Sequence, residues 1–228
     1  MCGRARQVFD WFHLKADLHA LGQPPDNLAP NWNAAPRQSL LVVRATGEAA
    51  VEAVRMVWGF VPRWERDPAG GRRPINAMTE TIAANLSAGR GMWADAFRHR
   101  RCLFPVDGFY EWQRDGTQKQ PYAIDRADGR VMGLAALWDR WRPPGSDAEL
   151  VSFAVITCPP NAVLAPIHTR MPVVLDPADY ASWLGGSTEA ALALCRPCPP
   201  ESVIAYRVGA RVGNVRNNDP SVAERLPA

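Results

Sequence analysis

The apolar residues near the start of the chain follow a helical spacing. They recur at intervals of three or four positions: Trp11, Leu14, Leu18 and Leu21. This spacing places all of them on one face of a helix. Gly22 and Pro24 are of the residue types that end helices, so we expect this helix to stop near them.

The runs that follow are shorter and richer in β-branched and aromatic residues, which is typical of strands. Six of them are bounded by Pro, Gly or Asp: 39–44, 51–60, 101–112, 122–125, 131–138 and 150–157. Asp128 and Gly129 lie between two of these runs, and this dipeptide predicts a β-hairpin turn.

Helical signals return in the last quarter of the chain. Residues 176–184 predict a short helix that has Asp176 as its N-cap, Pro177 in its first turn and Gly185 after its end. A second helix is expected around 187–195, followed by a strand near residues 202–208.

The order of these elements indicates the fold class. Strands and helices do not alternate regularly, and no Gly/Ser-rich or charge-rich linker divides the chain. We therefore expect an α+β fold with a single domain over residues 1–220, in which helices flank a curled, barrel-like mixed β-sheet core. Residues 221–228 carry few apolar groups and are expected to form a flexible tail.

The composition fits a packed globular protein, since 47% of the 228 residues are apolar. No stretch approaches the roughly 18–20 uninterrupted apolar residues of a membrane span, and the first residues lack the pattern of a secretion signal. We expect no membrane partner and a cytoplasmic or nucleoid-associated protein.

The charge is too small to indicate a nucleic-acid partner by itself, since the net value is only +3. Of the 26 basic residues only Lys15 and Lys119 are lysines, which leaves 24 arginines, and the planar guanidinium suits phosphate. A GC-rich genome, whose codons favour arginine throughout, is the alternative explanation. The clusters are more informative: Arg4 and Arg6, Arg72 and Arg73, and Arg98, Arg100 and Arg101.

The five cysteines are odd in number and widely scattered, unlike a disulfide framework. Cys195 and Cys198 have the spacing of half a zinc site, but no second pair follows them, and the four histidines are not arranged around them. We expect no metal and no cofactor.

Cys2 is the cysteine with the most distinctive position. Removal of Met1, which is usual before a small second residue, leaves Cys2 with a free amine and a thiol on adjacent carbons. The α-amine, with an ordinary pKa of roughly 7.7–8.0, is partly neutral near pH 7 and can attack an aldehyde, after which the sulfur can close a five-membered thiazolidine. The alternative is a cysteine that follows the start codon by chance.

Further segments place polar groups inside apolar runs. In residues 58–64 a strand ends at a proline turn that presents Trp64 beside a guanidinium. An aromatic ring of this kind stacks on a nucleic-acid base with roughly 1–3 kcal/mol and no sequence preference. We expect Trp58 to pack in the protein core. For Trp64, core packing is the alternative to stacking on a base. In residues 76–81, Asn76 reads as a turn residue and Glu80 as a helix or capping carboxylate.

Two titratable residues stand out. Glu111 lies between Tyr110 and Trp112, and apolar surroundings raise the pKa of a carboxyl so that it exchanges a proton near neutral pH. An outward-facing strand glutamate is the alternative. His168 and Arg170 share one face of an extended segment, and imidazole also trades protons near pH 7, although a lone histidine can be structural. Residues 212–219 crowd several asparagines together, which indicates structural hydrogen bonding near a site.

Together these segments resemble the SOS response-associated peptidase family, also called abasic-site processing proteins. The resemblance runs from Met1 to about Pro220 and rests on seven ordered motifs: Met-Cys-Gly-Arg, Asn-Ala-Ala-Pro, Trp-Gly-Phe-Val-Pro-Arg-Trp, Asn-Ala-x-x-Glu-Thr, Cys-Leu-x-Pro-x-Asp-Gly-Phe-Tyr-Glu-Trp, His-x-Arg-Met-Pro and Val-x-Asn-x-Arg-Asn. It implies binding to single-stranded DNA at abasic sites and a thiazolidine crosslink through Cys2 that shields the lesion from strand cleavage.

The resemblance also implies roles for individual residues. Cys2 corresponds to the nucleophile, Asn76 to a positioning and sensing residue, Glu111 to the proton-transfer carboxylate, and His168 to the group that helps to open the sugar. The family's DNA contacts fall on three further positions of this chain: Arg4, Trp64 and Arg170.

Position 78 departs from the family pattern. The family usually has Arg where this chain has Met78, so one phosphate contact is missing or is supplied by Arg72 or Arg73. We expect a monomer. Two other functions remain open: a cysteine-type peptidase or autopeptidase, with the Cys2 thiolate as nucleophile and His168 as base, and a noncovalent single-stranded DNA-binding module.

Overall fold

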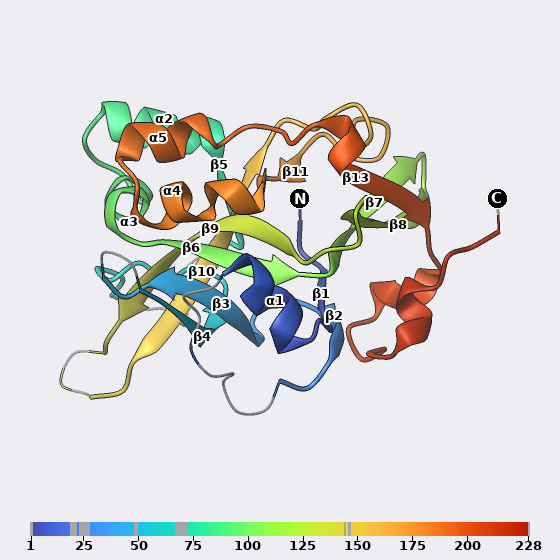
Figure 1. Ribbon diagram of the computed structural model, residues 1–228, viewed down its shortest axis with the longest axis horizontal. Helices are drawn as coiled ribbons and strands as arrows, with labels where there is room; N and C mark the ends of the chain where they lie inside the picture. The colour runs from blue at the N-terminus through green and yellow to red at the C-terminus, as the bar shows by residue number, and fades with distance from the viewer. Residues whose placement is uncertain are drawn as a thin grey trace.

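The computed structural model describes residues 2–18, 22, 28–47, 50–66, 73–143, 145 and 147–227. Two β-sheets form the centre of this described part, with short helices around them (Figure 1). The five-stranded sheet is antiparallel and contains, in spatial order, β13 (Val203–Arg207), β8 (Gln118–Arg126), β7 (Gly108–Asp115), β1 (Ala5–Gln7) and β2 (Asn31–Ala34).

The second sheet has eight strands and curls into a barrel. Its strands are β3 (Ser39–Ala45), β4 (Val51–Trp58), β5 (Asn76–Met78), β6 (Arg101–Val106), β9 (Met132–Trp141), β10 (Leu150–Cys158), β11 (Met171–Pro172) and β12 (Val174–Leu175). The pairs β4–β3, β3–β6, β6–β9 and β9–β10 are antiparallel, and β10 closes the ring by pairing with β4 in parallel. The predicted α+β fold with a curled mixed sheet is confirmed.

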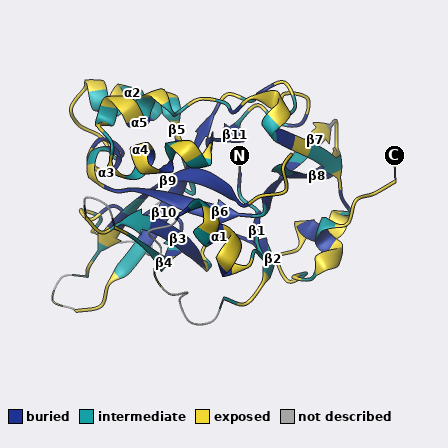
Figure 2. Cartoon of the chain, in the orientation of Figure 1, coloured by how far each residue is buried: buried dark blue, intermediate teal, exposed yellow. Residues whose placement is uncertain are grey.

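Aromatic rings fill the interior of this barrel. Trp58, Phe104 and Phe153 come from β4, β6 and β10, and their ring centroids lie 4.9–6.1 Å apart. All three side chains are fully buried, and β6 and β10 are mostly dark blue in the burial view (Figure 2). Trp58 is therefore a core residue, as predicted.

The helices are short and lie on the outside of the sheets (Figure 1). The α-helices are α1 (Trp11–Asp17), α2 (Thr79–Ser87), α3 (Ala94–His99), α4 (Tyr180–Gly185) and α5 (Thr188–Ala193). The 3₁₀ turns are η1 (Pro177–Asp179), η2 (Pro200–Ser202), η3 (Ala210–Gly213) and η4 (Pro220–Ala223). Asp176 accepts the Ala178 N–H at the start of η1, which confirms the predicted cap.

The first helix is shorter than predicted. It ends at Asp17, because Leu18 leaves the helical conformation (φ −129°, ψ 69°) while its side chain stays buried. Asp17 also forms an ion pair with Arg130, which ties the end of the helix to the chain before β9. Leu21 and Pro24 lie outside the described residues.

The predicted strand at 101–112 is in fact two strands in different sheets. β6 belongs to the barrel and β7 to the five-stranded sheet, and Asp107 lies between them. The Asp107 Oδ2 accepts N–H groups from Val8 at 2.6 Å and Phe9 at 3.0 Å, so this carboxylate joins the chain after β1 to the break between the strands. Asp107 thus anchors the seam between the two sheets.

Two other predictions are also wrong. The Asp128-Gly129 turn is not a hairpin, because β8 before it and β9 after it belong to different sheets. The predicted loose tail is held at three points: Val222 is fully buried, Arg225 forms a β-bridge with Val208, and the Leu226 N–H bonds to the Arg207 carbonyl. One buried apolar side chain and backbone pairing are enough to hold it.

Gly108 at this seam has no room for a side chain. A Cβ there would lie 2.3 Å from the Asp125 Oδ1 and 2.6 Å from both the Arg6 Nη2 and the Ile124 carbonyl. We expect Gly108→Ala to destabilise the protein by about 1–3 kcal/mol, which lowers the Tm by roughly 2–4 °C per kcal/mol. Thermal unfolding followed by circular dichroism measures the change. Gly209→Ala, which meets nothing within 4 Å, is the control, and an equal drop in both variants would contradict the packing argument.

Candidate functional site

Cys2 lies where the two sheets meet. It lies three residues before the start of β1 in the five-stranded sheet, and its carbonyl accepts a hydrogen bond at 3.0 Å from Asn76 Nδ2 on β5 of the barrel sheet. The cysteine is fully buried, and burial raises the pKa of its thiol well above the ordinary value. In the folded protein this sulfur is therefore a protonated thiol at neutral pH.

Glu111 faces Cys2 from β7. Its side chain is almost fully buried, and this burial raises the pKa of the carboxyl, while the nearby His168 acts in the opposite direction. The negative charge of Glu111 also raises the pKa of the Cys2 thiol, which shows that the two groups are close. The structure thus brings together Cys2, Asn76, Glu111 and His168 from four separate segments of sequence.

His168 is oriented by the backbone of its own loop. Its Nδ1 accepts the Arg170 N–H at 3.0 Å and also lies 3.1 Å from the Arg170 carbonyl oxygen. A neutral ring can accept from the N–H, and a protonated ring can donate to the carbonyl. Both protonation states have a partner on the Nδ1 side, and these backbone contacts fix the orientation of the ring.

Arg170 does not have a free guanidinium. Its Nη1 and Nη2 donate to the two carboxylate oxygens of Glu80 at 2.6 and 2.9 Å, and Nη2 also donates to the Thr157 carbonyl at 2.5 Å. These bonds lower the pKa of Glu80 to about 2, so the pair is ionised throughout the neutral range. Glu80 lies in the first turn of α2, which confirms that it is a helix residue.

Arg4 is likewise engaged within the protein. Its guanidinium donates to Asn33 Oδ1 at 2.9 Å and to the Val212 and Gly213 carbonyls at 2.7 and 3.3 Å. Asn33 Nδ2 in turn donates to three carbonyls of residues 212–217. The asparagine-rich segment is structural, as predicted, and it fixes the wall of the site next to Arg4.

The other predicted DNA contacts are spread along the loop that leads to Asn76. Trp64 is 61% exposed and Met78 is 42% exposed. Arg73 is half-buried and packs close to Gly59. Its Cβ lies 3.5 Å from the position that a Cβ on this glycine would occupy. Arg72 lies outside the described residues.

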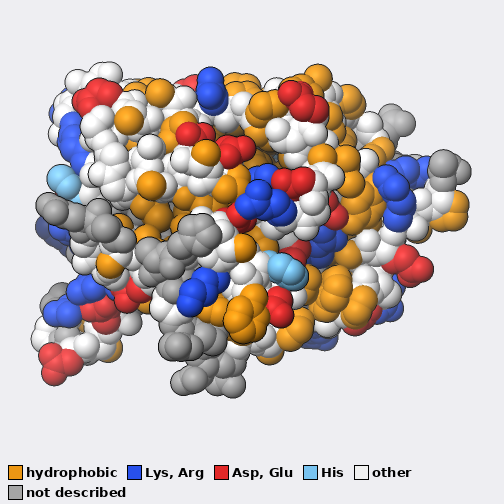
Figure 3. All heavy atoms as spheres, viewed as in Figure 1, with side chains coloured by type: hydrophobic (Ala, Val, Ile, Leu, Met, Phe, Trp, Pro, Cys, Tyr) orange, Lys and Arg blue, Asp and Glu red, His pale blue; other side chains and the backbone are white. Residues whose placement is uncertain are grey.

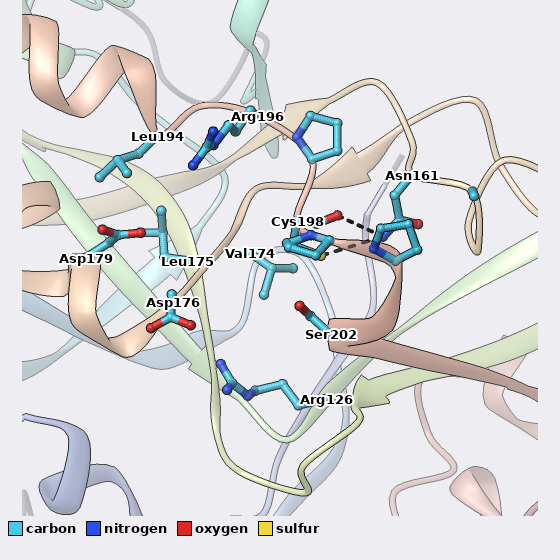
Figure 4. Close-up of a pocket in the computed structure, with 14 residues that line it drawn as sticks. Arg126, Asn161, Val174, Leu175, Asp176, Asp179, Leu194, Arg196, Cys198 and Ser202 are labelled. Carbon is cyan, nitrogen blue, oxygen red and sulfur yellow. Dashed lines mark hydrogen bonds between the residues drawn. The ribbon is translucent and has the colours of Figure 1, made fainter.

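The pocket shown in Figure 4 is not lined by Cys2, Asn76, Glu111 or His168. This pocket of about 510 Å³ lies between the β12–η1 turn and the Cys198 loop, where Asn161 Nδ2 donates to the Cys198 carbonyl (Figure 4). The face seen in Figure 3 shows basic side chains next to acidic ones and no broad basic field. Within the described ranges, no three His, Cys, Asp or Glu residues gather as a metal site, and no helix is both long and apolar enough to cross a membrane.

The chain belongs to the SOS response associated peptidase (SRAP) family, whose model matches residues 1–215. It is 30% identical to the abasic site processing protein YoqW of Bacillus subtilis (strain 168), over 98% of this chain and 99% of that protein. It is also 30% identical to the abasic site processing protein YedK of Escherichia coli (strain K12), over 95% and 96%. A crystal structure from Bacteroides thetaiotaomicron, 22% identical, has the same fold over 100% of both chains, with a TM-score of 0.84.

Sequence reasoning missed the partners that hold the site residues in place. Asn33 was part of a motif but had no role, Thr157 was not considered, and Glu80 was not linked to Arg170, which lies 90 residues away. The Oδ1 of Asn76 and the Oγ1 of Thr157 are buried without a hydrogen-bond partner in the part of the chain that the structure describes. Only strand register brings these groups together, since β5 and β10 pair in parallel.

Proposed function

We propose that this protein binds single-stranded DNA at abasic sites and forms a thiazolidine crosslink through Cys2 once Met1 has been removed. The observation that carries the proposal is the meeting of an N-terminal aminothiol with a buried carboxyl, an imidazole and an amide: Cys2, Glu111, His168 and Asn76. The names of YoqW and YedK, which describe abasic-site processing, support the same substrate. One chain supplies all four groups, so a monomer suffices.

The reaction begins with the sugar. An abasic deoxyribose is mostly a closed hemiacetal, so a proton must leave the ring hydroxyl and another must reach the ring oxygen before the aldehyde is exposed. His168, whose ring is oriented by its own loop, and Glu111, whose pKa is raised by burial, are the groups that we assign to move these protons. The amide of Asn76 holds the Cys2 carbonyl, and its buried, unpartnered Oδ1 offers an acceptor to the amine or to the sugar.

The amine attacks first, because burial keeps the Cys2 thiol protonated. The Cys2 nitrogen adds to the aldehyde carbon, water leaves, and an imine forms. The sulfur then bonds to the same carbon while its proton, carried by Glu111, ends on the nitrogen. Amine, thiol and aldehyde thus give thiazolidine and one water. Removing the imine also removes the species that would promote β-elimination of the DNA strand.

The peptidase alternative fits the site less well. A cysteine peptidase needs a thiolate, and reactive cysteines have a pKa that is lowered by nearby positive charge. In this protein both burial and the Glu111 carboxylate raise the pKa of the Cys2 thiol. No observation favours peptide hydrolysis over addition of the amine.

DNA contacts belong to the same proposal. Trp64 offers an exposed ring for base stacking, and Arg73 lies on the chain that leads into β5. The contact between Arg72 and DNA is proposed from the sequence alone, because Arg72 lies outside the described residues. The guanidiniums of Arg4 and Arg170 already donate hydrogen bonds within the protein. In this proposal they contact DNA either through N–H groups that are not used in these bonds or by exchanging a protein partner for DNA.

A denaturing gel tests the proposed function. Untagged protein, mixed with an oligonucleotide that carries one abasic site, is expected to give a heat-stable shifted band, whereas an undamaged oligonucleotide gives none. Intact mass of the same sample should lack Met1 and show a gain equal to the DNA fragment minus one water. Retained Met1 in active protein, or a band that heating dissolves, would overturn the crosslink.

Met78 gives a separate prediction about salt. Its exposed side chain stands beside Asn76, at a position where an arginine could reach a phosphate. We expect Met78→Arg to add one phosphate contact, which increases the slope of log Kd against log salt by about 0.7 for a single strand. Fluorescence anisotropy across a salt series measures this slope. Met78→Gln is the uncharged control, and an unchanged slope in the arginine variant would contradict the prediction.

A further inference from the structure

Four arginines meet in a pocket that the proposed chemistry does not use. This arginine pocket has a volume of about 560 Å³ and is lined by Arg63, Arg100, Trp138, Asp139, Arg140 and Arg142. The lining comes from β9, the turn after β4, the junction between α3 and β6, and the start of the β9–β10 connection.

The carboxylates in the arginine pocket balance only part of its positive charge. Arg63 and Arg100 both contact the same two carboxylates, those of Asp95 and Asp139, at 2.5–3.4 Å. This half of the pocket is neutral, with two guanidiniums facing two carboxylates.

Arg140 and Arg142 form the unbalanced half. Both contact Glu149, at 3.0 and 2.9 Å, and this is the one carboxylate that the described residues place in ion-pair range of either. Their side chains are 46% and 62% exposed, so the excess positive charge faces solvent. A guanidinium that shares its carboxylate in this way keeps donors for a phosphate, which it binds in pairs.

The pocket is suited to a nucleic-acid backbone rather than to bases. The aromatic ring in its lining, Trp138, already has the Arg44 guanidinium over its face at 4.4 Å, so that face does not serve as a stacking platform. Contacts from arginine to phosphate carry no sequence information, which matches a protein that must bind lesions in any sequence.

The structure connects the arginine pocket to Cys2 and Asn76. The loop after β4 is bonded to the segment that leads into β5, since the Phe60 N–H donates to the Pro74 carbonyl at 2.9 Å and the Trp58 Nε1 donates to the Ile75 carbonyl at 3.0 Å. This loop carries Arg63 at the pocket and the exposed ring of Trp64 next to it. Trp64 therefore lies between the pocket and Asn76 along the chain.

The register of β10 gives the length of this path. Val151 pairs with Arg140 at the pocket, and Thr157, six residues later, accepts the hydrogen bond from Arg170 beside His168. At about 3.3 Å per strand residue the separation is about 20 Å. That corresponds to about six nucleotides at the 3.4 Å spacing of a B-form strand, and to fewer in a stretched strand.

We propose that the arginine pocket binds backbone phosphates of the lesion-bearing DNA about six nucleotides from the abasic site, with Arg140 and Arg142 as the donors. The distance between the arginine pocket and the abasic site rests on the proposed function. The affinity of the pocket for phosphate does not. The pocket lengthens the footprint on DNA without taking part in bond formation.

Salt titration of binding to undamaged single-stranded oligonucleotides tests the proposal, with one of about 3 nucleotides, too short to span about 20 Å, and one of about 20 nucleotides. The double variant Arg140→Gln with Arg142→Gln should reduce the salt slope on the long oligonucleotide by about 1.4, since each phosphate contact contributes about 0.7. On the short oligonucleotide, which fills the stacking site alone, the slope should be unchanged. Arg140→Lys with Arg142→Lys should keep most of the slope.

Arg196→Gln is the matched control, because this exposed arginine lines the separate pocket of Figure 4. An equal loss of slope in the control, no loss in the double variant, or no binding of undamaged DNA by the wild type would each overturn the proposal. Adduct formation at saturating abasic DNA separates the two hypotheses. Adducts with unchanged slopes reject the arginine pocket alone, whereas altered slopes without any adduct reject the crosslink alone.

Discussion

Cys2→Ala abolishes the heat-stable adduct with abasic DNA. The variant keeps an N-terminal amine, so it still forms an imine, but it has no sulfur to close the ring, and an imine hydrolyses when the sample is heated in water. Denaturing gel electrophoresis of the protein with an abasic oligonucleotide measures the loss. Sodium borohydride, added before heating, should restore a stable band by reducing the imine, which tests whether the amine is the first nucleophile.

Cys102→Ala is the control for this experiment. Cys102 is fully buried and unpaired like Cys2, but it lies on β6 inside the barrel sheet. Its substitution should lower stability and leave the adduct intact. A stable adduct in Cys2→Ala without borohydride, or loss of the adduct in Cys102→Ala that still folds, would mean that Cys2 does not close the ring.

Glu111→Gln should slow adduct formation by roughly 100-fold, because a positioned acid or base typically contributes at least that much. The amide has nearly the same shape but neither accepts nor releases a proton near neutral pH. Single-turnover rates at several pH values measure the effect, and the wild-type dependence on pH that stems from Glu111 should disappear. A rate within about twofold of the wild type would assign Glu111 a structural role.

The same substitution should stabilise the protein. Burial raises the pKa of Glu111 in the folded state above its unfolded value of about 4.3, so the unfolded chain releases the proton first. Wild-type stability therefore decreases as pH rises from about 4.3 through the folded pKa, and Glu111→Gln lacks this decrease. The difference in Tm should be smallest at pH 4 and largest above the folded pKa. Lower stability of the variant at pH 7 would show that the carboxylate is compensated by its neighbours.

The strands of the barrel could be predicted because they are long and bounded by clear breaks. β3, β4, β9 and β10 match the predicted runs closely at their first residues. The break at Asp107 could not be predicted, because what ends β6 is a pair of backbone N–H groups on Val8 and Phe9, about 100 residues earlier. A local pattern contains no information on such a partner.

The candidate residues could be named from the sequence, but the contacts that position them could not. Cys2, Glu111 and His168 stood out by their own chemistry, Asn76 was named only through the family resemblance, and all four stay candidates. The short strands β1 and β5, which position two of them, have three residues each and carry no periodicity to read. The pairing of Arg170 with Glu80 likewise depends on register between distant segments.

The burial of Cys2 at the seam sets an order on maturation. An aminopeptidase needs several residues of extended, accessible chain, and in the folded protein the residue after the cleavage point is enclosed by both sheets. Under the proposed function, removal of Met1 therefore has to take place before β1 joins β7. Protein that folds with Met1 attached would lack the free Cys2 amine, so under this proposal the active fraction of a preparation reflects the competition between trimming and folding in the producing cell.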